Sequence, residues 1–233
     1  MKLHLPKIFS NFNKKSINFI TIDGITCSGK SKLSKLLVKS LKNRTNNIQI
    51  LSKDLFLKTR QQRVKITKKI KKNLTNQNEL HYDLKKLRTL IKFFINPGKK
   101  KELKFFNLYN RKNGKNDLSI NFKFNPKSLI IFEGIYVNDD IKNIIRPKIK
   151  ILVVETIYNS LSRKIERIRD KKISIQNVIK EFTKIHLFSY KKYLLKHKYD
   201  LNFKFEISKF TKLKNGKERQ ISLIKKFLSK HSF

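Results

Sequence analysis

The sequence is poor in the residues that build disulfide frameworks, membrane spans and flexible linkers. Its 233 residues include one Cys, four Pro and six Gly, with no Trp and no Ala. A lone Cys excludes an intramolecular disulfide framework and fits a reducing compartment. The longest apolar runs, such as Leu129–Phe132 and Ile151–Val154, fall far short of the ~20 residues of a membrane-spanning helix. Residues 1–16 are basic and lack the apolar stretch typical of a signal peptide. We therefore expect a cytoplasmic protein with no membrane partner.

Acidic residues are also scarce. Asp and Glu number 16 against 57 Lys and Arg, which gives a net charge of +41. Such a charge is typical of surfaces that bind nucleic acid or anionic membranes. It also follows from a compositional bias, because Lys, Asn, Ile and Phe, whose codons are rich in A and T, are in surplus. The basic residues are scattered through every segment, whereas a binding face would gather them. We therefore favour the bias and predict no specific nucleic-acid partner.

A hydrophobic share of 39% with 18 Phe is enough to fill the core of one domain. Apolar runs rich in β-branched and aromatic residues predict strands at Ile17–Ile22, Ile48–Leu51, Leu129–Phe132, Ile149–Val154 and Leu201–Ile207. Between and after these runs, apolar residues recur at helical spacing and predict amphipathic helices. The first apolar residues of four such helices are Leu33, Leu84, Leu161 and Val178, and a closing helix is predicted over 221–228. Strands that alternate with helices predict an α/β fold with a doubly wound, mainly parallel sheet of about five strands, covered on both faces.

The chain shows no linker that would separate two large domains. Residues 1–16 are interpreted as a basic N-terminal extension and residues 17–233 as a single domain. Two segments within that domain, Asn96–Lys101 and Arg111–Asn116, have the composition of loops.

One motif carries specific chemistry. Gly24, Gly29, Lys30 and Ser31 satisfy the phosphate-loop (P-loop) pattern G-x-x-x-x-G-K-[ST], between a predicted strand and a predicted helix. The glycines permit a tight turn whose backbone N–H groups point at phosphate oxygens, where the helix dipole adds positive potential. Lys30 then reaches the β- and γ-phosphates, and the Ser31 hydroxyl coordinates Mg²⁺. We expect the Lys30 ammonium to face solvent in the empty loop. The predicted nucleotide-binding residues are Gly24, Ile25, Thr26, Cys27, Ser28, Gly29, Lys30 and Ser31, with Cys27 as a small spacer.

A P-loop alone leaves GTPases, ATPases and small-molecule kinases open, although the N-K-x-D motif typical of guanine recognition is absent. Four further segments narrow the choice. Ser52–Phe56 forms S-x-D-x-F, and Leu129–Ile135 forms an apolar strand followed by Glu-Gly. Leu161–Arg167 carries two arginines at helical spacing, and Tyr193–Asp200 precedes the last predicted strand. In this order the segments resemble the uridine kinase and phosphoribulokinase group of P-loop kinases, most closely uridine kinase, over about residues 17–206.

The resemblance implies ATP-dependent phosphorylation of a hydroxyl group on a small metabolite, with Mg²⁺ as cofactor and GTP as an open alternative. Asp54, just past the end of a strand that we expect to neighbour the P-loop strand, would accept the proton of the acceptor hydroxyl. Glu133 would hold Mg²⁺ together with Ser31. Arg163 and Arg167 would close over the triphosphate and neutralise its charge. The implied acceptor-binding residues are Asp54, Asp83, Tyr109 and Arg111, although Asp83 also suits a helix cap.

The acceptor is the least constrained part of this prediction. In uridine kinases a Tyr and a His, five residues apart, help to recognise the base. Here Tyr109 fits the first position, but Gly114 occupies the second. A nucleoside is the leading acceptor, and a sugar phosphate, a pantothenate-like compound, nicotinamide riboside and glycerate are alternatives. A basic RNA-associated protein that uses its P-loop as a switch is a different class that stays open, as does a homo-oligomeric state.

Overall fold

The computed structural model describes residues 3, 5–10, 17–43, 45, 47–69, 80–168, 175–182, 188–205 and 209–212. The helix predicted over 221–228 lies outside these residues. Within the described part of the chain, no helix is both long enough and apolar enough to cross a membrane.

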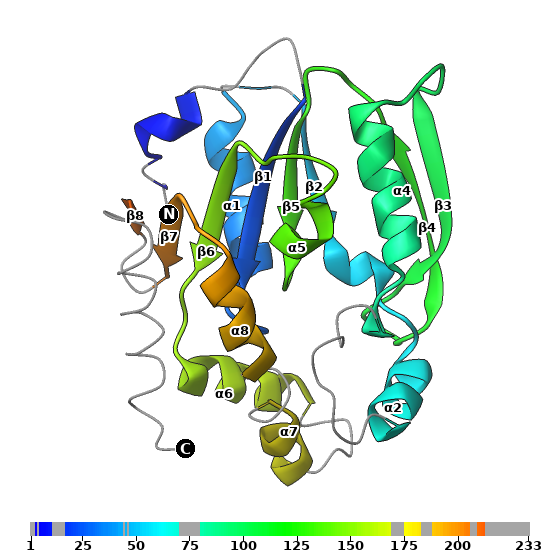
Figure 1. The fold of residues 1–233 in the computed structure, drawn as a ribbon, viewed down its shortest axis with the longest axis vertical. Helices are drawn as coiled ribbons and strands as arrows, with labels where there is room; N and C mark the ends of the chain where they lie inside the picture. The colour runs from blue at the N-terminus through cyan, green and yellow to red at the C-terminus, as the bar shows by residue number, and fades with distance from the viewer. Residues whose placement is uncertain are drawn as a thin grey trace.

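A six-stranded sheet forms the centre of the molecule (Figure 1). Its strand order is β2-β5-β1-β6-β7-β8. The first five strands pair in parallel, and β8 is added antiparallel at the edge. All five predicted strands are therefore present, and the prediction of a mainly parallel sheet is confirmed. The strands are β1 (Asn18–Gly24), β2 (Ile48–Ser52), β5 (Leu129–Glu133), β6 (Ile149–Val153), β7 (Leu201–Lys204) and β8 (Lys209–Lys212).

Helices cover both faces of this sheet (Figure 1). Successive side chains of a strand point to opposite faces, so each central strand packs against helices on both sides. In β1, Ile20 and Ile22 pack in one apolar cluster with Leu33 and Leu37 of α1 (Lys30–Leu41). Phe19 points the other way, into a cluster with α4 (Leu84–Ile95) and α5 (Val137–Ile141).

The first cluster also includes part of the predicted N-terminal extension. A short 3-10 helix, η1 (Lys7–Ser10), places Phe9 in it with no exposed surface, and Leu3 joins the same cluster. The described residues of this segment are therefore packed on the domain.

An antiparallel hairpin, which the sequence patterns did not predict, extends the second cluster. Its strands β3 (Glu102–Tyr109) and β4 (Asn116–Lys123) form a separate two-stranded sheet beside α4. Phe105 meets Phe122 edge to face, and Phe122 meets Phe94 of α4 in the same way. The two predicted loops, Asn96–Lys101 and Arg111–Asn116, lead into this hairpin and connect its strands.

The remaining elements gather where the parallel strands end. They are η2 (Lys53–Phe56), α2 (Arg60–Lys69), α6 (Ile157–Ile168), α7 (Ile175–Glu181) and α8 (Phe188–Lys196). In Figure 1, α2, α6 and α7 lie at the lower end, to which the arrowheads of β5 and β6 point. Doubly wound sheets bind their ligands at this carboxyl end, so these helices surround the expected site.

Candidate nucleotide and acceptor site

The P-loop is a tight turn between β1 and α1, and its glycines are required by its geometry. Gly29 has φ 100°, a conformation that other residues rarely adopt. A Cβ added at Gly24 would lie 2.6 Å from the Ser28 Oγ and 3.0 Å from the Val153 carbonyl oxygen. A Cβ at Gly29 would lie 2.4 Å from the ring of Phe205. The turn therefore has room for backbone only, as a loop that wraps phosphate requires.

The Lys30 side chain folds back into this turn. Its ammonium donates hydrogen bonds to the carbonyl oxygens of Gly24 and Ile25, both at 2.8 Å. Burial lowers the pKa of Lys30, and the charges of Glu133 and Asp54 oppose that shift. The expectation that this ammonium faces solvent was wrong, because the loop carbonyls solvate it in place of water.

The two predicted metal ligands contact each other. The Ser31 hydroxyl donates a hydrogen bond of 3.2 Å to Oε1 of Glu133, which ends β5 with 4% of its surface exposed. Burial raises the pKa of Glu133, and the charge of Asp54 raises it further. Among the described residues, no group of three or more His, Cys, Asp or Glu could hold a metal ion. A hydroxyl and one carboxylate fit Mg²⁺, which keeps several waters and takes further oxygens from phosphates.

Asp54 lies next to this pair because β2 and β5 run side by side, with Ser52 opposite Glu133. The prediction that its strand neighbours the P-loop strand was wrong, because β5 lies between β2 and β1. The 3-10 helix η2 then turns Asp54 toward the hairpin. Oδ2 of Asp54 forms an ion pair with Nη2 of Arg111 at 2.5 Å. Oδ1 of Asp54 accepts a hydrogen bond from the Tyr82 hydroxyl at 3.4 Å. Burial raises the pKa of Tyr82 well above its ordinary value, so this hydroxyl stays a donor.

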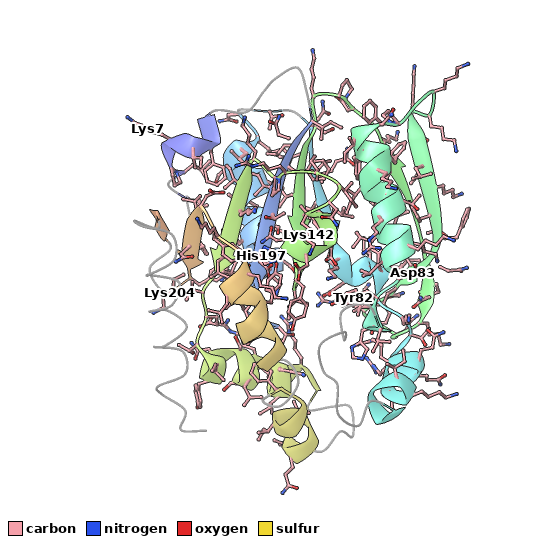
Figure 2. All side chains as sticks on the ribbon, in the orientation of Figure 1. Lys7, Tyr82, Asp83, Lys142, His197 and Lys204 are labelled. Carbon is pink, nitrogen blue, oxygen red and sulfur yellow. The ribbon has the colours of Figure 1, made fainter. Side chains whose placement is uncertain are left out.

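The other predicted acceptor residues lie on the hairpin side of Asp54. Tyr109, near the end of β3, accepts a hydrogen bond of 2.8 Å from Nη2 of Arg63 on α2. Asp83 caps α4, since its Oδ1 accepts from the Lys86 backbone N–H at 3.1 Å. Figure 2 shows Tyr82 and Asp83 together near the lower end of α4. The structure gives Asp83 a structural role, and its binding of an acceptor stays a prediction.

Both predicted lid arginines touch the P-loop from α6. Nη1 of Arg163 donates to the Cys27 carbonyl oxygen at 3.3 Å and to Oε2 of Glu155 at 2.6 Å. Nη1 of Arg167 lies 3.5 Å from the Cys27 sulfur. The backbone of Cys27 has φ 61°, so this residue turns its carbonyl and side chain toward α6. The sequence placed these arginines on one helix, and the structure places that helix over the loop.

Comparison with known proteins adds to this geometry. No family model matches the sequence, and no curated protein is similar to it. A solved structure described as a possible uridine kinase from Bacillus stearothermophilus is 14% identical with a TM-score of 0.58, over 81% of this chain and 86% of that one. A protein proposed to be a fructose transport system kinase from Silicibacter sp. TM1040 is 15% identical with a TM-score of 0.58, over 80% of this chain and 89% of that one. This chain has an α/β P-loop NTPase fold.

Within this P-loop NTPase fold, sequence reasoning missed a buried carboxylate directly before the loop. Asp23 has no exposed surface, and it accepts a hydrogen bond of 2.7 Å from the Gly24 backbone N–H. The hydroxyls of Tyr193 and Tyr190, on α8, also donate to it, the latter at 3.4 Å. Burial raises the pKa of Asp23. The signal was a single acid directly before the loop, in a strand with no other charged residue.

Three further charged residues around the candidate site were also missed. Lys53 has no exposed surface and pairs with Asp140 of α5 at 2.6 Å. A Cβ at Gly134 would lie 2.6 Å from the Cβ of Lys53, which explains why glycine follows Glu133. Glu155, after β6, anchors Arg163 as described above. Lys53 and Asp140 are distant in the sequence, so no local pattern indicated their pairing. The pairing of Glu155 with Arg163, eight residues later, was not predicted either.

Proposed function

We propose that this protein transfers the γ-phosphoryl group of ATP, with GTP as an alternative donor, to a hydroxyl group of a small molecule. The observation that carries the proposal is the position of Asp54. This carboxylate follows β2, which β5 separates from the P-loop strand β1. It lies beside Glu133 and within electrostatic reach of Lys30. A nucleotide switch needs the P-loop and the metal ligands, but it needs no carboxylate on the acceptor side.

The donor side of the site is built for a triphosphate with Mg²⁺. The backbone N–H groups of residues 24–31 and the Lys30 ammonium would bind phosphate oxygens. Ser31 and Glu133 would hold Mg²⁺, directly or through water. The bound metal neutralises charge on the phosphates. Arg163 and Arg167, which already contact the loop at Cys27, would add positive charge on the opposite side.

Asp54 would act on the acceptor. A carboxylate at the carboxyl end of β2 can orient a hydroxyl and take its proton, an effect of about 10²–10⁴-fold in rate. Tyr82 and Arg111 hold its two oxygens and so fix its orientation. Burial and the charge of Asp54 raise the pKa of the neighbouring Glu133, and a bound cation would oppose that shift.

A nucleoside, as in the uridine kinases that the sequence resembles, stays a prediction for the acceptor. Tyr109 is the residue predicted to recognise the base, and its hydroxyl is engaged by Arg63. Gly114 offers no side chain for base recognition. It has φ 78°, and a Cβ there would lie 3.3 Å from the Arg60 guanidinium carbon. Recognition of the acceptor therefore depends on other residues of the site.

The proposal is tested by a screen for ADP release that depends on an added acceptor. The purified protein is incubated with Mg·ATP and with nucleosides, sugars, sugar phosphates and small hydroxy acids in turn. We expect one class of acceptor to stimulate ADP release. Lys30→Ala should abolish that release, whereas Lys35→Ala, on the exposed face of the same helix, should leave it unchanged. Normal turnover in Lys30→Ala would contradict the proposal.

A further inference from the structure

Two arginines from different elements face the Asp54–Tyr82 pair. Arg111, on the turn between β3 and β4, contacts Asp54 directly, and the charge of Asp54 raises the pKa of Arg111. Arg63, on α2, is close enough for its charge to favour ionisation of the Tyr82 hydroxyl, against the larger effect of burial. The acceptor side of the site therefore presents Arg111 against the Asp54 carboxylate and Arg63 on the side of Tyr82 and Tyr109.

Arg63 is held in place before any ligand binds. Its Nε donates to the Lys58 carbonyl oxygen at 3.0 Å, and its Nη2 donates to the Tyr109 hydroxyl. Its guanidinium carbon also lies 5.0 Å from the centre of the Tyr109 ring. Contacts from both sides fix the plane of the guanidinium, which is the arrangement that binds carboxylate and phosphate groups most strongly.

Arg111 is held differently. More than half of its side chain is exposed, and its described partner is the carboxylate that should receive the acceptor hydroxyl. A neutral acceptor would have to approach Asp54 while Arg111 keeps its ion pair. An acceptor with its own anionic group would give Arg111 a second partner and leave Asp54 available for the hydroxyl. The ion pair thus opposes neutral acceptors and favours charged ones.

We infer that the acceptor carries a carboxylate or phosphate group in addition to its hydroxyl, and that Arg111 and Arg63 bind this anionic group beside Asp54. The inference rests on the proposed phosphotransfer function and narrows its substrate class. It separates sugar phosphates and hydroxy acids from free nucleosides, which have no such group.

Matched pairs of acceptors test the inference. The pairs are D-ribulose 5-phosphate with D-ribulose, glycerate with glycerol, and pantothenate with panthenol, and uridine and cytidine are included as neutral nucleosides. We expect turnover of an anionic compound with kcat/KM at least about 10-fold above that of its neutral partner, as a charge-assisted hydrogen bond provides. The phosphate and carboxylate arms identify which anionic group is used.

Variants show whether the arginines cause this preference. Arg111→Gln and Arg63→Gln should each reduce the ratio of anionic to neutral kcat/KM by about 10-fold or more. Arg88→Gln, an exposed arginine on α4, is the control and should leave the ratio unchanged. Because a ratio is measured, a loss of folded protein cancels, and Arg111 is in any case an exposed turn residue.

The outcomes distinguish this inference from the proposed function. A neutral nucleoside as the preferred acceptor, or a ratio that neither variant changes, would overturn the inference and leave phosphotransfer in place. ATP binding without phosphotransfer to any compound would overturn the proposed function, and this inference with it.

Discussion

Replacing Glu155 by Gln isolates the contact that holds α6 against the P-loop. Oε2 of Glu155 forms an ion pair with Arg163 at 2.6 Å. The guanidinium of Arg163 also donates to the Cys27 carbonyl oxygen. Oε1 accepts from the Thr156 backbone N–H and from the Asn159 side chain, both at 2.9 Å. Gln keeps an oxygen for those two contacts, but it presents an N–H₂ group to Arg163. The change therefore releases the arginine and leaves the start of α6 intact.

The magnitude follows from the burial of the two partners. Glu155 is 5% exposed, whereas the Arg163 side chain is 42% exposed. A charge-assisted hydrogen bond contributes about 1.5–3 kcal/mol, and solvent screening of the arginine reduces this to about 1–2 kcal/mol. If Arg163 stabilises charge that develops during phosphotransfer, this energy corresponds to a fall of about 5- to 30-fold in kcat. KM for ATP should change less than kcat.

The assay is steady-state ADP release with the acceptor found by the screen, together with thermal unfolding of each variant. Glu166→Gln is the matched control, because Glu166 is an exposed glutamate on the same helix. It should retain the activity of the unmodified protein. Equal activity of Glu155→Gln and Glu166→Gln, with both folded, would refute a positioning role for Glu155.

Three other predictions concern the loop, the metal site and the net charge. Gly29→Ala should lower the melting temperature and weaken ATP binding, measured by calorimetry, because its Cβ meets Phe205 at 2.4 Å and its φ is 100°. Glu133→Gln should abolish Mg²⁺-dependent turnover and yet raise the free energy of unfolding at pH 7. The pKa of Glu133 is raised in the folded state, so its ionised form destabilises the fold; the difference between the variants should vanish as pH falls below 4.5, the ordinary value. RNA binding, measured by fluorescence anisotropy, should be indifferent to sequence and should weaken steeply with salt, because the +41 charge is scattered. A sequence-selective complex at physiological salt would contradict that expectation.

The strands and the P-loop were predictable because their signals are local. The central strands β1 and β5 are buried along their whole length, and such a strand appears as an apolar run such as Leu129–Phe132. The motif of residues 24–31 is contiguous, and its glycines are fixed by the turn itself. Asp54 and Glu133 could be found because each ends or follows a strand of that sheet. The structure then brings them together through the pairing of β2 with β5.

The acceptor side was not predictable to the same degree, because its contacts join distant segments. The hairpin was missed because its strands are half exposed and alternate polar with apolar residues, as at Leu118, Ile120 and Phe122 of β4, and so form no continuous apolar run. Arg63 was missed because its role depends on Tyr109, 46 residues later, and on the placement of α2. The orientation of Lys30 was wrong because a sequence motif does not show how an empty loop solvates its own ammonium group.

Asp54→Asn tests the central claim most directly. The substitution keeps the size of the side chain but removes the proton acceptor, and its single amide oxygen can accept from only one of Arg111 and Tyr82. The measurement is transfer of ³²P from γ-labelled ATP to the acceptor, with ATP affinity measured in parallel by calorimetry. We predict a loss of transfer of about 10²-fold or more with ATP affinity retained. Transfer at the rate of the unmodified protein would contradict the role of Asp54 and the phosphotransfer site that is built around it.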